Sequence, residues 1–183
     1  MKPTTQFIER RKEARIPFND KVIFTDGQKT STAYAVNISR GGVFVMSLDP
    51  FPIDTQIFLA FCLPSHPTTF CVKGKVAHIV FDRQRCEVEN GMGLMFLELD
   101  ESQKSIMNLH ILNQQSAYLE LKKLLTSERP APSEITRCLR KIPTLSPSSD
   151  LLSLRYRASR ICSIFEPPPD IQVNNDNQTR KTA

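Results

Sequence analysis

The sequence lacks any stretch that resembles a membrane span or an export signal. Its apolar runs are far shorter than the ~20 residues that cross a bilayer. The N-terminus, Met1-Lys2-Pro3-Thr4, leads into a charged stretch without an apolar signal region. The five cysteines are odd in number and irregularly spaced, which excludes a regular disulfide framework. These absences predict a cytoplasmic protein in a reducing compartment.

Residue types that usually carry catalysis are few and scattered. The three histidines, His66, His78 and His110, fall in different segments, no Ser or Cys has a recognisable catalytic partner, and there is no glycine-rich phosphate loop. Cys62, His66 and Cys71 match no common zinc spacing. Because both cysteines lie inside apolar strand patterns, we expect them to be buried in the core. The sequence therefore predicts no enzyme, no metal and no cofactor.

Positive charge is in only moderate excess. The 183 residues carry a net charge of +5, and residues 126–183 contribute nine Lys or Arg against six Asp or Glu. Nucleic-acid-binding proteins usually concentrate charge more strongly. The aromatic residues also fall mainly at expected core positions rather than among the basic residues. We expect no DNA partner, and weak RNA affinity through the basic tail stays open.

Residues 16 to about 99 show one strand pattern after another. Turn signals such as Asp26-Gly27 separate the strands at short intervals, and no helical pattern intervenes. Gly91-Met92-Gly93 indicates a bulge or a close approach of two backbones. The pattern predicts an antiparallel sandwich or barrel. The expected strands are 21–25, 30–38, 42–46, 56–63, 69–80 and 86–99.

A helical period begins at Asp100. This residue is a good N-cap, and Gln103 stands where a capping box requires it. Residues 101–125 contain neither Gly nor Pro, so they predict one long helix. Its apolar face should close one end or side of the barrel. That face comprises Met107, Ile111, Tyr118, Leu121 and Leu125.

Composition changes after Leu125. Four prolines break residues 126–149 into an expected linker with at most a short helix near 134–141. Residues 150–166 predict an amphipathic helix, and the polar stretch 167–183 is expected to be disordered.

The amphipathic helix leaves two interpretations open. Its apolar stripe could dock on a partner groove or an acidic membrane surface, or it could pack back on the barrel. The stripe consists of Leu151, Leu154, Ala158, Ile161 and Phe165.

Two short motifs occur in order, with a strand pattern between them. Arg11 and Arg15 form Arg-x-x-x-Arg, and Asn37, Ser39 and Gly42 form Asn-x-Ser-x-x-Gly. Alone, the first usually marks a solvated surface and the second a turn. Their combination is more specific, because the second motif also runs from the end of one strand into another.

Together the motifs resemble the signature of the PilZ domain, the bacterial receptor module for cyclic di-GMP. The similarity covers about residues 8–125. The stretches Arg40-Gly41-Gly42-Val43-Phe44-Val45 and Gly91-Met92-Gly93-Leu94-Met95-Phe96 also resemble the family pattern. The resemblance implies a six-stranded antiparallel β-barrel with a C-terminal helix. It also implies that a flexible N-terminal arm, residues 1–15, folds over the ligand.

The resemblance implies cyclic di-GMP as the ligand and assigns the motif residues to it. Arg11 and Arg15 would contact phosphate and guanine, since a guanidinium pairs with both groups and stacks on a base. Asn37, the accepted alternative to Asp, would contact a guanine together with Ser39 and Gly42. Candidate additional contacts are Arg10, Arg40 and Gly41.

The function implied is that of a non-enzymatic receptor. On binding ligand it would change conformation and regulate an unknown downstream protein in motility, biofilm formation or secretion. The alternative is a ligand-independent adaptor that acts through the barrel surface or the helix at 150–166, where peripheral membrane contact is also conceivable.

Overall fold

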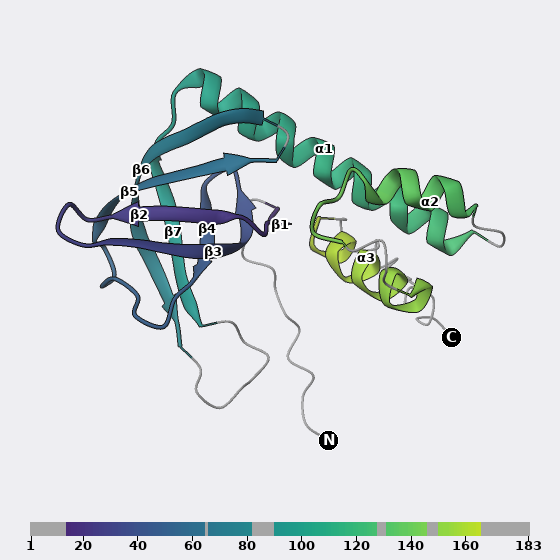
Figure 1. Ribbon diagram of the computed structural model, residues 1–183, viewed down its shortest axis with the longest axis horizontal. Helices are drawn as coiled ribbons and strands as arrows, with labels where there is room; N and C mark the ends of the chain where they lie inside the picture. The colour runs from purple at the N-terminus through teal and green to yellow at the C-terminus, as the bar shows by residue number, and fades with distance from the viewer. Residues whose placement is uncertain (1–13, 65, 82–89, 128–130, 146–149, 166–183) are drawn as a thin grey trace, which may run out of the picture.

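The computed structural model describes residues 14–64, 66–81, 90–127, 131–145 and 150–165. A β-barrel lies at one end of the molecule and a group of helices at the other, as Figure 1 shows. The strands are β1 (Ile16–Pro17), β2 (Lys21–Thr25), β3 (Thr30–Ser39), β4 (Gly42–Met46), β5 (Gln56–Leu63), β6 (His66–Val80) and β7 (Gly91–Glu98). The helices are α1 (Glu101–Thr126), α2 (Pro132–Leu139) and α3 (Leu151–Phe165).

Six antiparallel strands close the barrel. Their order is β3-β2-β5-β6-β7-β4, and β4 pairs back with β3. The short strand β1 adds to β3, with Ile16 opposite Ile38 and Pro17 opposite Asn37. The predicted six-stranded antiparallel barrel with a C-terminal helix is therefore confirmed, and the additional strand β1 pairs with the end of β3.

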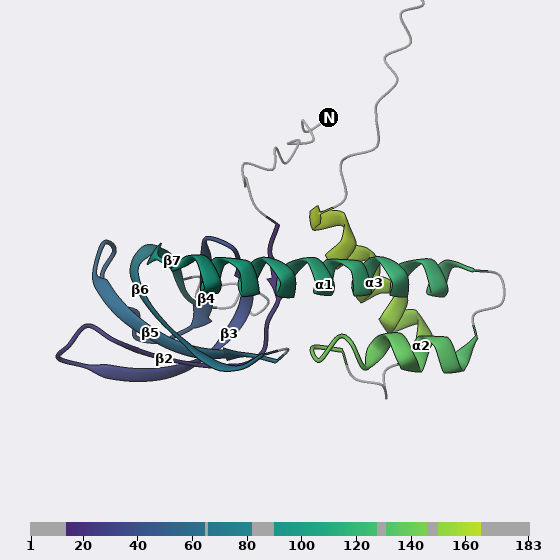
Figure 2. The ribbon, with the colours of Figure 1, turned by 90° about the horizontal axis from the view of Figure 1, so that it is seen from above.

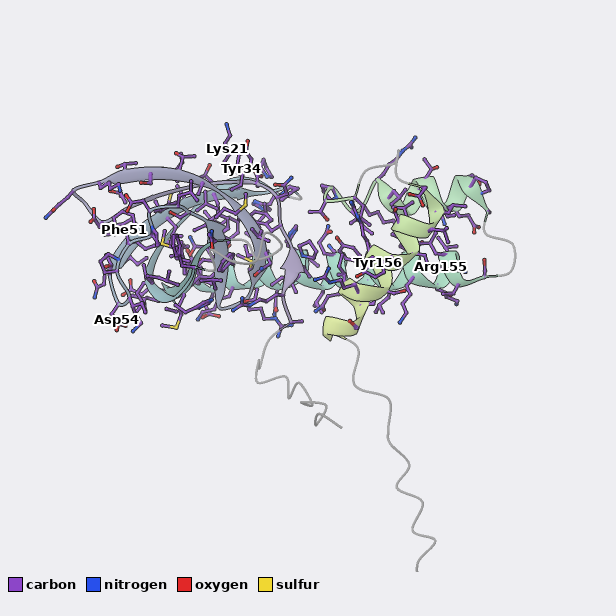
Figure 3. The ribbon with its side chains drawn as sticks, turned by 90° about the horizontal axis from the view of Figure 1, so that it is seen from below. Lys21, Tyr34, Phe51, Asp54, Arg155 and Tyr156 are labelled. Carbon is purple, nitrogen blue, oxygen red and sulfur yellow. The ribbon has the colours of Figure 1, made fainter. Side chains whose placement is uncertain are left out.

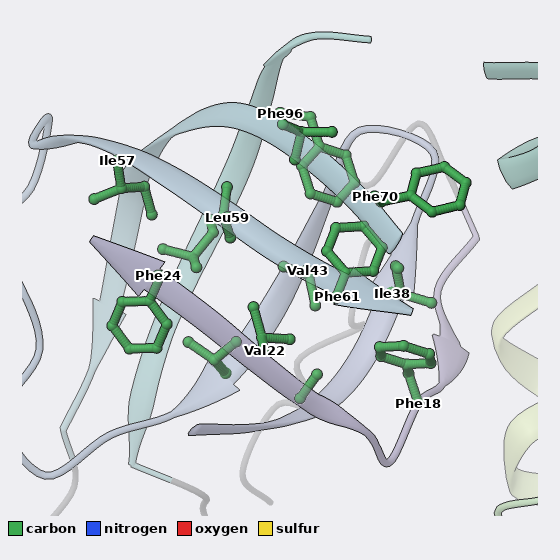
Figure 4. Close-up of a cluster of buried hydrophobic side chains, with 14 of the residues drawn as sticks. Phe18, Val22, Phe24, Ile38, Val43, Ile57, Leu59, Phe61, Phe70 and Phe96 are labelled. Carbon is green, nitrogen blue, oxygen red and sulfur yellow. The ribbon is translucent and has the colours of Figure 1, made fainter. Parts of the chain in front are cut away.

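Alternating side chains fill the barrel interior. In β5, Ile57, Leu59, Phe61 and Leu63 are buried while the residues between them are more exposed, as the period of two requires. Phe61 stacks on Phe70 and Phe96, with ring centroids 5.4 and 5.8 Å apart. Figure 4 shows these rings in the core. Burial of each such side chain stabilises the fold by about 1.5–3 kcal/mol.

The same alternation corrects the prediction for two cysteines. Cys62 and Cys71 are exposed rather than buried. Cys62 lies between the buried residues Phe61 and Leu63, so its side chain points to the outer face of the sheet. Among the described residues, no group of His, Cys, Asp or Glu is arranged to hold a metal ion.

Helix α1 begins with the predicted capping box. The Asp100 carboxylate accepts the Gln103 backbone N–H at 2.7 Å, and the Gln103 side chain accepts the Asp100 N–H at 3.1 Å. All five residues of its predicted apolar face are buried, but they belong to two separate hydrophobic clusters. Met107 and Ile111 join the barrel core, whereas the others join a second cluster. The helix therefore closes the barrel with its first half only.

The second half of α1 packs with α2 and α3, and Figure 2 shows both helices beside it. We call residues 117–165 the helical module. The short helix expected at 134–141 lies at Pro132–Leu139. Segment 131–145, within the expected linker, contributes buried side chains of Ile135, Cys138, Leu139, Ile142 and Leu145.

Helix α3 packs on this module rather than exposing its predicted stripe. Leu154, Ala158 and Cys162 are buried, whereas Leu151 is 56% exposed. The side chain of Phe165 and residues 166–183 lie outside the described part of the chain. Among the described helices, none combines the length and apolar character that a bilayer span needs.

Candidate ligand-binding site

The turn from β3 into β4 forms one wall of a shallow pocket of about 200 Å³. The opposite wall comes from the neighbouring strands β6 and β7, and the lead-in to β1 supplies an arginine. The lining residues are Arg15, Ser39, Gly41, Gly42, Val43, Ala77, His78, Gly93, Leu94 and Met95. Three of the predicted ligand contacts, Arg15, Ser39 and Gly42, thus meet at one place although the sequence separates the two motifs.

Arg15 reaches the pocket because β1 pairs with the end of β3. Ile16 pairs with Ile38 of β3, and its fully buried side chain anchors β1. The residue before it, Arg15, therefore lies beside the Ser39 end of β3, where its half-buried side chain lines the pocket. Arg10 and Arg11 lie outside the described residues, so the other half of the Arg-x-x-x-Arg motif is not placed.

Asn37 and Ser39 point to the same face, two residues apart on β3. The Ser39 hydroxyl donates a long hydrogen bond of 3.4 Å to the Gly42 carbonyl. Asn37 is half-buried, and its side-chain oxygen is buried without a hydrogen-bond partner among the described residues. Such an orphaned acceptor costs about 1–3 kcal/mol. Asn37 is not among the residues that line the pocket, so the structure does not bring this predicted contact together with Arg15, Ser39 and Gly42.

Glycine at position 42 permits a close approach of two strands. A side chain there would run into the backbone carbonyl of Leu94 on β7. Gly91 has the same relation to the Val45 carbonyl on β4. The close backbone approach predicted from Gly91-Met92-Gly93 is therefore confirmed at Gly91, at the far end of β4, whereas the close approach at Gly42 lies beside the pocket.

Arg40 and Gly41, the further candidate contacts, separate in the structure. Gly41 lines the pocket, and its carbonyl accepts the Phe96 N–H at 2.9 Å. Arg40 is exposed and lines a different recess of about 360 Å³ near the start of α1.

His78 is a pocket residue that the sequence interpretation missed. Its ring stacks on Phe44, with centroids 6.0 Å apart and an interplanar angle of 27°. Strand alternation through Val72, Gly74 and Val76 would send His78 inward, but β6 shifts register between Val76 and His78. This bulge turns the imidazole to the outer face. His78 pairs with Gly93, which leaves room for the ring because it has no side chain, and no local pattern in the sequence indicates this pairing.

A larger recess of about 410 Å³ lies over β2, β5 and β6 on the outer surface of the barrel. It is lined mainly by apolar residues, among them Ile23, Phe58 and Leu59, and by none of the predicted contacts. The recess at the β3–β4 turn is smaller, but it gathers a guanidinium, a hydroxyl, an imidazole and glycine backbone. That set of groups suits a flat, anionic ligand, so we take the smaller recess as the candidate site.

Comparison with known proteins places the chain in a family. A sequence model described as PilZ domain matches residues 9–113. No curated protein matches the sequence. The fold is similar to that of the inhibitor of motility MotI/DgrA of Bacillus subtilis, at 20% identity and a TM-score of 0.51. This match covers 60% of the present chain and 52% of the MotI chain, so the chain spans about half the length of that relative.

Two further solved structures have lower scores. The PilZ domain of YcgR from Escherichia coli, solved with c-di-GMP, has 13% identity and a TM-score of 0.43, over 57% of this chain and 90% of that one. The MrkH–c-di-GMP complex of K. pneumonia has 14% identity and a TM-score of 0.48. This match covers 58% of the present chain and 52% of the MrkH chain. The family match spans more than half of the sequence and includes both motifs. The chain therefore belongs to the PilZ domain family.

Proposed function

We propose that the chain is a cytoplasmic, non-enzymatic receptor for cyclic di-GMP, and that the ligand binds at the pocket beside the β3–β4 turn. One observation carries the proposal: Arg15, Ser39 and Gly42, from two separate motifs, line the same recess. A cyclic dinucleotide presents two phosphates and two guanines. Arginine can pair with phosphate or with a guanine edge, while serine and glycine allow a flat ring to approach the strand end.

The Asn37 side chain adds a second reason. Its buried oxygen lacks a donor among the described residues, and guanine carries N–H donors on its edge. Asn37 does not line the pocket in this structure, so its side chain would have to turn towards the ligand; a guanine that then donates to it would satisfy an acceptor without a partner among the described residues. This requirement selects for a base with exposed N–H groups rather than for any phosphate compound.

Ligand binding would change the position of the N-terminal arm. Arg15 stands at the start of β1, so a ligand held by Arg15 and Arg11 would draw residues 1–15 towards the barrel surface. The altered surface would then control a downstream protein in motility, biofilm formation or secretion. The differential contacts of the ligand with the closed arm would supply the free energy of this change.

A double substitution of the motif arginines tests the proposal. Arg11→Ala with Arg15→Ala should keep the barrel folded and abolish measurable cyclic di-GMP binding, because removing one partner of a desolvated charge pair already costs about 2–5 kcal/mol. The matched control is Arg137→Ala with Arg140→Ala, which removes the same charge from α2 and its C-cap. Calorimetric titration that finds full binding by the folded motif variant would refute the proposed site.

A further inference from the structure

Helix α3 presents a second, outward face that its packing leaves uncovered by the described residues. Leu154, Ala158 and Cys162 are buried in the helical module. On the opposite side, Leu152 and Tyr156 are 76% and 67% exposed. Arg160 follows Tyr156 by four residues, so these three side chains form one line along the helix. Figure 3 shows Tyr156 on α3.

Arginine is the only charged residue type within α3. The helix contains Arg155, Arg157 and Arg160 and no Asp or Glu. Arg155 donates to the Leu125 carbonyl at 2.6 and 3.0 Å, which anchors the helix without neutralising the guanidinium. Arg157 and Arg160 are exposed and form no ion pair with any residue that the structure describes. The outer face therefore carries two cations, without ion-pair partners in the described part of the chain, beside two exposed apolar groups.

The acidic residue that precedes α3 already has partners. Asp150 precedes the helix, and its carboxylate accepts the Ser153 N–H at 2.9 Å and the Ser153 hydroxyl at 2.6 Å. These hydrogen bonds lower the pKa of Asp150, so it stays ionised as a helix cap. It therefore serves the start of α3 rather than neutralising the arginines further along.

Positive charge is also concentrated on the helical module as a whole. Residues 117–165 contain nine Lys or Arg against four Asp or Glu, a net charge of +5. Residues 14–116, which include the barrel, contain nine Lys or Arg against ten Asp or Glu. The two ends of the molecule thus differ in charge, and an anionic surface would attract the helical end.

We propose that the outer face of α3 docks on the surface of an anionic lipid bilayer. A leucine and a tyrosine flanked by arginines suit the boundary between headgroups and acyl chains, where apolar groups insert and cations remain with the phosphates. Nucleic acid would attract the arginines but would leave Leu152 without an apolar contact. The convex ridge of a surface helix fits a bilayer without a matching groove. This inference goes beyond the receptor function and does not depend on it.

Vesicle binding by the full chain tests the charge requirement. The protein should sediment with vesicles of phosphatidylglycerol and phosphatidylethanolamine and not with phosphatidylcholine alone. Arg157→Gln with Arg160→Gln should weaken binding about 30-fold, since each basic residue near the surface contributes about fivefold. Lys21→Gln with Lys29→Gln removes the same charge from the barrel and should change binding little. Equal losses in the two variants would overturn the proposal.

A tryptophan reporter tests insertion of the apolar residues. The sequence contains no tryptophan, so Tyr156→Trp provides a single emitter on the proposed face. Its emission should shift to the blue when anionic vesicles are added. Tyr34→Trp, on the 46%-exposed Tyr34 of the barrel, is the matched control and should not respond. An unchanged Tyr156→Trp spectrum on bound vesicles, or binding to DNA or polyglutamate but not to vesicles, would contradict lipid docking.

Discussion

The imidazole of His78 lies directly over Gly93, and the three atoms that a Cβ at that glycine would meet first all belong to the His78 ring. The ring also stacks on Phe44, which pairs with Gly93 across β4 and β7. The absence of one side chain therefore lets an imidazole from β6 lie across β7 and contact β4. The ring in turn forms part of the candidate site.

Gly93→Ala should push the His78 ring out of its place and weaken cyclic di-GMP binding. The added methyl would overlap the imidazole, and overpacking of this kind costs about 1–3 kcal/mol. Urea unfolding and calorimetric titration of the variant measure both effects.

His78→Ala provides the control for this clash. In that background, Gly93→Ala should destabilise the protein much less, because the atoms it would meet have been removed. An equal loss of stability with and without the His78 ring would show that the glycine serves a different purpose.

Replacement of Asn37 by leucine should separate stability from binding. The Asn37 oxygen is buried without a partner among the described residues, so its removal should leave the free energy of unfolding unchanged or raise it by about 1 kcal/mol. Ligand affinity should fall, because the acceptor for guanine is lost. Denaturant unfolding measures the free energy of unfolding, and calorimetric titration of the same protein preparation measures the affinity for cyclic di-GMP. Unchanged affinity would exclude Asn37 from the site.

Leu121→Ala should destabilise the helical module. Leu121 is fully buried in the second cluster, and deletion of such a side chain typically costs about 2–5 kcal/mol. Leu119→Ala is the matched control on the same helix, since Leu119 is 41% exposed and its truncation should cost about 0.5 kcal/mol or less. Thermal unfolding followed by far-ultraviolet circular dichroism compares them. Equal effects would contradict the packing of α1 in this cluster.

Acid should destabilise the protein through His110. Burial lowers the pKa of this side chain below its usual value of about 6.5. Between its folded and unfolded pKa values, the unfolded state binds more protons, so stability is lost as the pH falls below about 6.5. Urea unfolding at a series of pH values should show a smaller acid loss for His110→Gln than for the wild type. An identical pH profile would exclude His110 as a cause.

Local patterns in the sequence were sufficient for the barrel and for the start of α1. The period of two located the strands, and Asp100 with Gln103 located the cap. The same period failed at His78, because the bulge in β6 reverses which face the residue occupies. Such a bulge depends on pairing between distant strands, which no local pattern reports.

The packing of the C-terminal region was harder to predict. Prolines made residues 126–149 look like a linker, although Ile135, Cys138, Leu139 and Ile142 repeat with a helical spacing and are buried. Cys162 shares the buried side of α3 with Leu154 and Ala158, whereas Leu151 extends beyond the cluster. The stripe was recognisable in the sequence, but its partner was not, because contact between α3 and α1 joins distant segments.

The receptor function is tested most directly by isothermal titration of the full chain with cyclic di-GMP, with GTP and cyclic di-AMP as controls. We expect selective, saturable binding of cyclic di-GMP, and the stoichiometry will distinguish one bound molecule from a stacked pair. No binding by folded protein, verified by a second method, would contradict the receptor function and favour the alternative of a ligand-independent PilZ adaptor.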